Sequence, residues 1–144
     1  MTGNIKKIRD RQLASPLKSE TLQDLVRHEL EEKKHTAAEG LLWLNRGLDF
    51  TSKGIALNLE TPTEELSVSF RAAYGDTLKP FHSFVVKPIF SAAMSATPYR
   101  KDFYAKLGDD QAKVEEQGRE WLKSLISIVN ILKEFMAKPE NQWK

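Results

Sequence analysis

The chain has 144 residues, of which 40% are hydrophobic and 29% charged, proportions typical of one globular domain (residues 1–144) with a single core. A net charge of +2 gives no reason to expect nucleic acid as a partner, and the absence of cysteine excludes disulfides and thiolate metal sites. No apolar run is long enough for a transmembrane helix, and basic residues crowd the start, where a signal peptide would be apolar. A cytoplasmic protein fits these features.

Two short helices are predicted in the first third of the chain. The first covers residues 3–13, places Asn4 and Lys7 on one face, and ends before Ser15-Pro16. The second covers residues 19–33, with Glu29 on its solvent side and an apolar stripe formed by Leu22, Leu25, Val26 and Leu30.

A longer helix is predicted from residue 36 to about residue 59, because Pro62 cannot continue it. Thr36 and Glu39 have the spacing of a capping box at its start. Its apolar positions follow helical spacing: Ala37, Leu41, Leu44 and Leu48. Trp43 lies in the middle of this helix, where periodicity alone allows either a core side chain or a platform for a ligand.

The next two helices are predicted at residues 64–79 and 81–96. The second is apolar almost all round, so we expect it to be central and buried, with Pro88 kinking it or shifting its start. His82 falls within this segment, as either a satisfied core histidine or a functional one.

In the last third of the chain, a short helix is predicted from Pro98 to Leu107 and a long helix at residues 111–137, capped by Asp109 or Asp110. The long helix has a regular seam, which Trp121, Ile126, Ile128 and Ile131 are expected to broaden: Gly118, Leu122, Leu125, Val129, Leu132 and Met136. Trp143, after Pro139, is expected to be loosely held. No segment has strand alternation, so the predicted fold class is all-α.

No catalytic or metal-binding constellation is found in the sequence. His28, His35 and His82 have no partner at zinc-ligand spacing, and phosphate-binding loops and nucleophile motifs are absent. The sequence therefore predicts no enzyme activity, no cofactor and no metal.

Two segments carry a resemblance to a known family. Residues 42–50, Leu-Trp-Leu-Asn-Arg-Gly-Leu-Asp-Phe, and residues 80–90, Pro-Phe-His-Ser-Phe-Val-Val-Lys-Pro-Ile-Phe, resemble the two signatures of the glycolipid transfer protein family, in their order and at their separation. The similarity is greatest to the fungal heterokaryon-incompatibility C-type members. It implies a two-layer helical sandwich that binds a glycosphingolipid and transfers it between membranes, with transient contact to the membrane surface.

The resemblance also implies roles for individual residues. Asn4, Lys7 and Trp43 would hold the sugar headgroup, and His82 would bond the ceramide amide. Phe84 would lie near the membrane-facing side, and Phe90 would be a wall residue of the cavity. These types suit the ligand, because amide and ammonium groups bond sugar hydroxyls and an aromatic ring matches the apolar face of a sugar.

The family pattern is incomplete at the start of the chain. The headgroup Asp of the family would precede Met1, so the chain looks N-terminally shortened and without the first helices. We therefore expect weaker sugar binding, exposed apolar surface and self-association through that surface. The alternative is a transfer-deficient helical module for lipid sensing or protein interaction.

Overall fold

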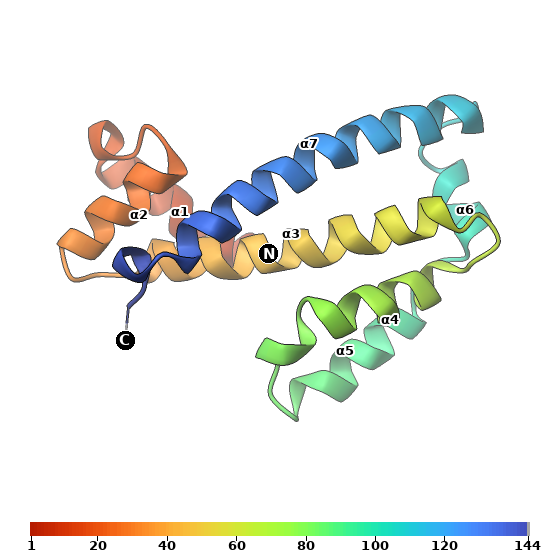
Figure 1. The fold of residues 1–144 in the computed structure, drawn as a ribbon, viewed down its shortest axis with the longest axis horizontal. Coiled ribbons are helices and arrows are strands. Elements are labelled where there is room, and N and C mark those ends of the chain that lie inside the picture. Colours follow the sequence, from red (N-terminus) through yellow and green to blue (C-terminus); the bar gives the residue numbers. More distant parts are fainter. Residues whose placement is uncertain (144) are drawn as a thin grey trace. The chain divides into compact units, whose positions relative to one another are not determined.

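The computed structural model describes residues 1–143, and within that range its regular structure is helical throughout (Figure 1). The α-helices are α1 (Thr2–Ala14), α2 (Leu22–Glu31), α3 (Thr36–Glu60), α4 (Leu66–Asp76), α5 (Val86–Ser95), α6 (Arg100–Ala105) and α7 (Gln111–Ala137). Short 3₁₀ turns lie at Pro16–Lys18, Lys79–Phe81 and Pro139–Asn141. The all-α class is confirmed, and none of the described helices is both long and apolar enough to span a bilayer.

The chain forms two compact units. The first comprises residues 1–47 together with the chain from residue 128 onward, and the second comprises residues 48–127. The two long helices, α3 and α7, contribute to both units. A single domain over the whole length remains a prediction.

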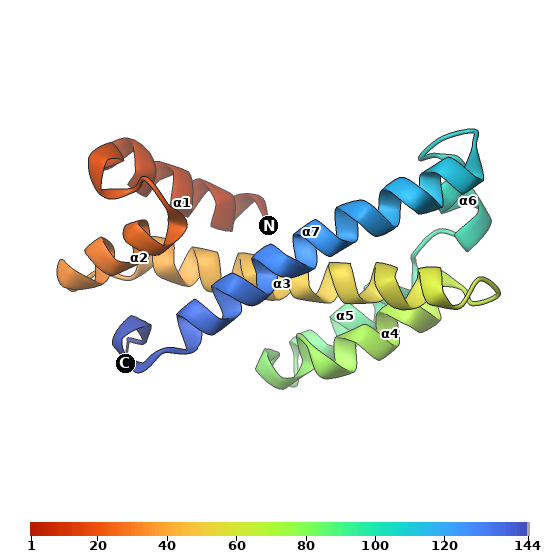
Figure 2. The same cartoon turned by 45° about the horizontal axis from the view of Figure 1, so that its top comes forward.

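The core of the first unit joins α2, the beginning of α3 and the end of α7, with α1 alongside (Figure 2). Its buried side chains are Leu25, Val26, Ala37, Ala38, Leu41, Leu132, Phe135 and Met136. The seam predicted for α7 therefore packs as expected over its second half. Trp143 is not loosely held as predicted, because it packs against this core and stacks on His35 with ring centroids 5.5 Å apart.

Glu29 corrects the prediction for the start of α3. It is buried rather than exposed, and its two carboxylate oxygens accept hydrogen bonds from the backbone N–H groups of Ala37 (3.0 Å) and Ala38 (2.8 Å). The carboxylate thus satisfies donors that a helix N-terminus leaves without partners, and it suits the positive end of the helix dipole. Thr36 is the first residue of α3 rather than a residue outside its N-terminus. A cap supplied from the preceding helix has no signature in local spacing.

An aromatic cluster forms the core of the second unit near α4 and α5. Buried Tyr74, Leu78 and Met94 pack with Phe50, Phe70 and Phe90. Gly54 of α3 lets the Phe70 ring approach closely, since a β-carbon at Gly54 would lie 2.7 Å from that ring. The glycine therefore positions α4 against the second half of α3.

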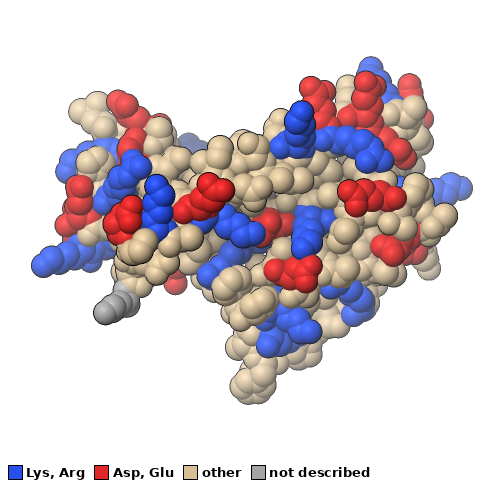
Figure 3. Space-filling model, in the orientation of Figure 1, with Lys and Arg blue, Asp and Glu red and all other residues tan. Residues whose placement is uncertain are grey.

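The segment 81–96 differs most from its prediction. The helix begins only at Val86, with Pro88 in its first turn, where a missing N–H costs no helical bond. Met94 is its one buried residue in the structure. Large apolar side chains are exposed at and before the helix: Phe81, Phe84, Val85, Val86 and Ile89. The end of the α4–α5 hairpin is accordingly tan in the space-filling view (Figure 3).

Two further predictions for the last third need correction. Trp121, Ile128 and Ile131 are each more than half exposed, so they do not broaden the buried seam of α7. The helix α6 begins at Arg100, and Pro98 lies outside it. The Asp110 cap is confirmed, because its carboxylate accepts a hydrogen bond from the Lys113 N–H (3.1 Å).

Candidate functional site

In the first unit, α1 approaches α3 closely along the backbone, and an ion pair joins α1 to the residue that follows α2. A β-carbon added at Gly40 of α3 would lie 3.1 Å from both the Asn4 carbonyl oxygen and the Lys7 β-carbon. Arg11 donates two hydrogen bonds of 2.8 Å to the Glu32 carboxylate, and this pairing lowers the pKa of Glu32 to about 2. The predicted headgroup residues Asn4 and Lys7 therefore lie directly on α3, and both are half-buried.

Trp43 belongs to the face of α3 that α1 contacts. Gly40 touches the middle of α1, and Gly47 lies 3.6 Å, measured from an added β-carbon, from the end of the Met1 side chain. Trp43 lies between these glycines at helical spacings of three and four residues, so it shares their face. The structure thus brings three predicted residues, Asn4, Lys7 and Trp43, to one side of the first unit.

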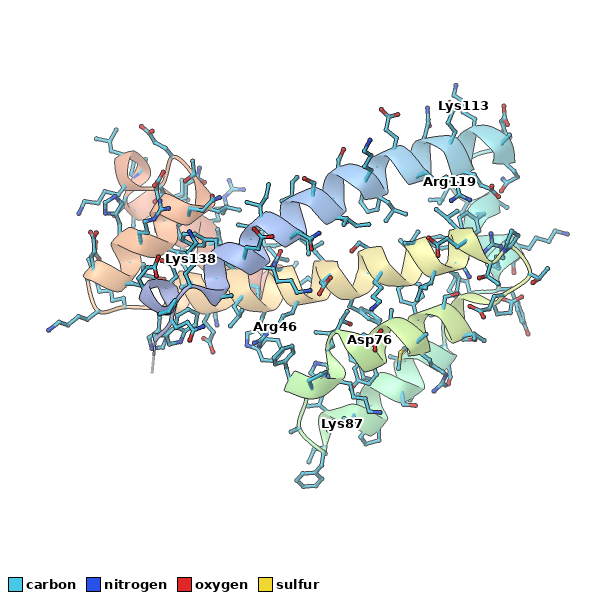
Figure 4. All side chains as sticks on the ribbon, in the orientation of Figure 1. Arg46, Asp76, Lys87, Lys113, Arg119 and Lys138 are labelled. Carbon is cyan, nitrogen blue, oxygen red and sulfur yellow. The ribbon has the colours of Figure 1, made fainter. Side chains whose placement is uncertain are left out.

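Two charged side chains complete this group. Lys7 pairs with Glu39, whose Oε2 lies 3.3 Å from the ammonium nitrogen. The Arg46 guanidinium lies 4.8 Å from the centre of the Trp43 ring, a cation–π contact, and burial lowers the pKa of Arg46 (Figure 4). From the sequence, Glu39 was predicted only to cap the helix with Thr36, and Arg46 was given no role. Two three-residue spacings, Thr36–Glu39 and Trp43–Arg46, were the available signals in the sequence, because each spacing places its two residues on one face of the helix.

In the second unit, His82 lies outside the helix on which it was predicted. It follows the 3₁₀ turn Lys79–Phe81 in an extended conformation (φ −88°, ψ 136°). Its Nδ1 lies 3.1 Å from the Tyr74 hydroxyl oxygen, and its ring meets that of Phe90 edge-on at 5.0 Å. Burial is the main cause of a lowered His82 pKa, and the charge of Lys87 lowers it further (Figure 4). The imidazole is therefore neutral near pH 7.

The aromatic rings around His82 pack together in one continuous cluster. Tyr74 and Phe90 stack with centroids 5.0 Å apart, and Phe50 meets Phe90 edge-on at 5.4 Å. Phe90 is thus half-buried within the cluster, whereas Phe84 is 86% exposed and takes no part in it. The sequence provided no reason to pair Tyr74 with His82, since eight residues and a turn separate them.

A separate pocket of about 320 Å³ opens on the surface of the second unit. Its lining is mixed and largely polar: Glu65, Ser67, Ser95, Thr97, Pro98, Tyr99 and Asp102. None of the predicted site residues lines it, so this pocket is not the apolar cavity that the resemblance implies.

The comparisons with known proteins decide the family. The family model described as glycolipid transfer protein matches residues 1–109 of the chain. The chain belongs to the glycolipid transfer protein family. It is 69% identical over 143 residues to a glycolipid transfer protein from Aureobasidium melanogenum, and the match covers 99% of this chain and 71% of that protein.

Solved structures of this family have the same fold as the chain. The crystal structure of HET-C2, a fungal glycolipid transfer protein, matches with a TM-score of 0.95 at 62% identity, covering 99% of this chain and 72% of that one. A structure described as showing how FAPP2 selects simple glycosphingolipids matches with a TM-score of 0.85 at 30% identity, covering 94% and 70%. The predicted fungal affinity and the glycolipid transfer protein fold are confirmed.

Proposed function

We propose that this chain binds a glycosphingolipid and transfers it between membranes without converting it chemically. The observation that carries the proposal is the meeting of Asn4, Lys7 and Trp43 on one side of the first unit of a glycolipid transfer protein family member. The relatives support the ligand class, since HET-C2 is a glycolipid transfer protein and FAPP2 is described as selecting simple glycosphingolipids. The cytoplasm is the compartment we propose.

The headgroup is assigned to the first unit. A sugar ring stacks on Trp43 through its apolar face, while Asn4 and Lys7 bond its hydroxyls. Sugar hydroxyls also need acceptors, and the half-exposed Glu39 carboxylate beside Lys7 supplies one. Because exposed ion pairs contribute little by themselves, Lys7 and Glu39 can exchange their contact for the ligand at low cost.

The ceramide is assigned to the second unit. His82 hydrogen-bonds the ceramide amide, and the aromatic cluster beside it, including Phe90, offers an apolar wall for the chains. A hydrocarbon chain of about 16 methylenes would cost roughly 13 kcal/mol to expose to water, at about 0.8 kcal/mol per methylene. A carrier must therefore enclose the chains that it removes from a bilayer.

Transfer between vesicles tests this function. Donor vesicles carry fluorescent glucosylceramide, fluorescent phosphatidylcholine or fluorescent ceramide-1-phosphate, and unlabelled acceptor vesicles are added with the protein. We expect faster transfer of glucosylceramide only. Equal transfer of the three lipids would contradict sugar recognition. Failure to move glucosylceramide would contradict the carrier and favour the transfer-deficient sensing or interaction module.

We also propose that the exposed tip around Phe84 contacts the membrane. Replacing Phe84 with Asp should reduce binding to neutral vesicles about tenfold or more, because burying a phenylalanine side chain contributes roughly 1.5–3 kcal/mol. Vesicle co-sedimentation measures the effect. Leu17→Asp is the matched control, since Leu17 is 89% exposed in the first unit. Equal losses in the two variants would show that no particular region contacts the membrane.

Self-association is the third part of the proposal. Ile128 and Ile131 are both more than half exposed on α7, close together on one helix. Exposed apolar patches of this kind favour contacts between copies. Light scattering during size-exclusion chromatography is expected to show a mass that rises with protein concentration, and a constant monomer mass would contradict this part.

A further inference from the structure

The buried hydroxyl of Tyr74 has one partner in the described part of the chain. Tyr74 is 6% exposed, and its oxygen lies 3.1 Å from Nδ1 of His82. No other hydrogen bond involves this hydroxyl within residues 1–143. Burial raises the pKa of Tyr74, so the phenol keeps its proton at neutral pH.

The proton of this phenol determines the state of the imidazole. A buried hydroxyl that donates no hydrogen bond is costly, and Nδ1 is the acceptor within its reach. Nδ1 can accept only if it carries no proton, and a neutral imidazole then carries its proton on Nε2. The lowered pKa of His82 agrees with a neutral ring.

The surrounding aromatic rings restrict the orientation of the Tyr74 and His82 side chains. Tyr74 stacks on Phe90 at a centroid distance of 5.0 Å, and the His82 ring contacts both rings, at 5.6 Å and 5.0 Å. His82 itself follows a turn in extended backbone, where no helical hydrogen bonds hold it. Tyr74 and Phe90 therefore both act on the orientation of the imidazole, and Tyr74 does so through its hydroxyl as well as its ring.

We propose that Tyr74 is a positioning residue that holds His82 as the Nε2–H tautomer, so that the imidazole meets its ligand as a hydrogen-bond donor. A donor on the imidazole requires an acceptor atom on the ligand. This inference deepens the proposed function and rests on it for the identity of the ligand. The tautomer itself is a property of the ligand-free protein.

Nitrogen-15 NMR of the imidazole tests the tautomer directly. In the ligand-free protein, Nδ1 of His82 should have the shift of an unprotonated, hydrogen-bonded nitrogen and Nε2 that of a protonated one. Tyr74→Phe keeps the ring and removes the hydroxyl, so it should move His82 toward a mixture of tautomers. Tyr104→Phe is the matched control, because it removes another buried tyrosine hydroxyl, bonded to Asn58 at 3.1 Å, in the same unit.

The outcomes separate the two levels of the inference. A proton on Nδ1 in the unchanged protein, or equal tautomer populations in Tyr74→Phe and the unchanged protein, would overturn the positioning role. Tyr74→Phe should also weaken glucosylceramide binding about fivefold, the effect of one hydrogen bond, and unchanged affinity would overturn the link to the ligand. If the unchanged protein binds no glucosylceramide while the tautomer result holds, the proposed function fails and the role of Tyr74 stands.

Discussion

Replacing Trp43 with alanine is expected to reduce glucosylceramide transfer by roughly 30-fold. The substitution removes the aromatic platform for the sugar and the ring that the Arg46 guanidinium covers at 4.8 Å. Aromatic residues at the centre of a binding site commonly contribute about 2 kcal/mol, which corresponds to this factor in affinity. The vesicle transfer assay measures it.

The controls separate loss of the platform from loss of the fold. Trp121→Ala removes the same side chain from an exposed position on α7 and should leave transfer within about twofold of the unchanged protein. Trp43→Phe keeps an aromatic face and should retain more transfer than Trp43→Ala. Circular dichroism must show equal helix content in the variants. Full transfer by a folded Trp43→Ala protein would contradict the assigned headgroup site.

Replacing Glu29 with alanine is expected to lower the free energy of unfolding by about 3 kcal/mol. The change leaves the buried N–H groups of Ala37 and Ala38 without an acceptor, and each such group costs about 1–3 kcal/mol. It also removes a negative charge from the N-terminus of α3. Urea denaturation followed by circular dichroism measures the loss.

Two substitutions calibrate this result. Glu29→Gln keeps one acceptor oxygen and should cost less than Glu29→Ala. Glu31→Ala, on the exposed side of the same helix, loses only a surface contact with His28 and should change the free energy of unfolding by less than about 1 kcal/mol. A loss in Glu29→Ala as small as that in Glu31→Ala would show that the carboxylate does not hold the start of α3.

The long helices were predictable because strong local signals define them. Pro62 limits α3, Asp110 caps α7, and the apolar spacing of both helices is regular over many turns. Because many apolar residues repeat at helical spacing, the assignment of each helix does not depend on any single residue. The bounds Thr36–Glu60 and Gln111–Ala137 accordingly agree with the predicted ranges.

The predictions that were wrong concern residues whose burial depends on contacts with other elements of the fold. The segment 81–96 is apolar almost all round, but apolar content alone does not show which side chains another element covers, and Phe84 is exposed. Glu29 was predicted to be exposed because a charged side chain is usually solvated. Its hydrogen-bond partners, the N–H groups of Ala37 and Ala38, lie eight and nine residues later in the chain, and local spacing does not predict these contacts. Trp143 follows the end of α7 yet stacks on His35, a contact between distant parts of the chain.

The candidate site was predicted by resemblance rather than by physics. Periodicity left Trp43 and His82 as either core or binding residues, and only the family signatures assigned them a ligand. The structure adds the neighbours that resemblance did not supply: Glu39 beside Lys7, Arg46 over Trp43 and Tyr74 on His82. The contacts of Glu39 with Lys7 and of Tyr74 with His82 join different elements, so spacing along the chain could not have assigned them. Arg46 lies three residues after Trp43 on α3, and this spacing fits their contact without giving it a role.

Native mass spectrometry tests the central claim most directly. The protein is incubated with vesicles that contain a neutral glycosphingolipid, a phosphatidylcholine and a ceramide-1-phosphate in equal amounts, and the intact complexes are weighed. The account predicts one glycosphingolipid per protein molecule, with little of the other two lipids. A protein that emerges without lipid, or one that carries the three lipids in equal proportion, would contradict it.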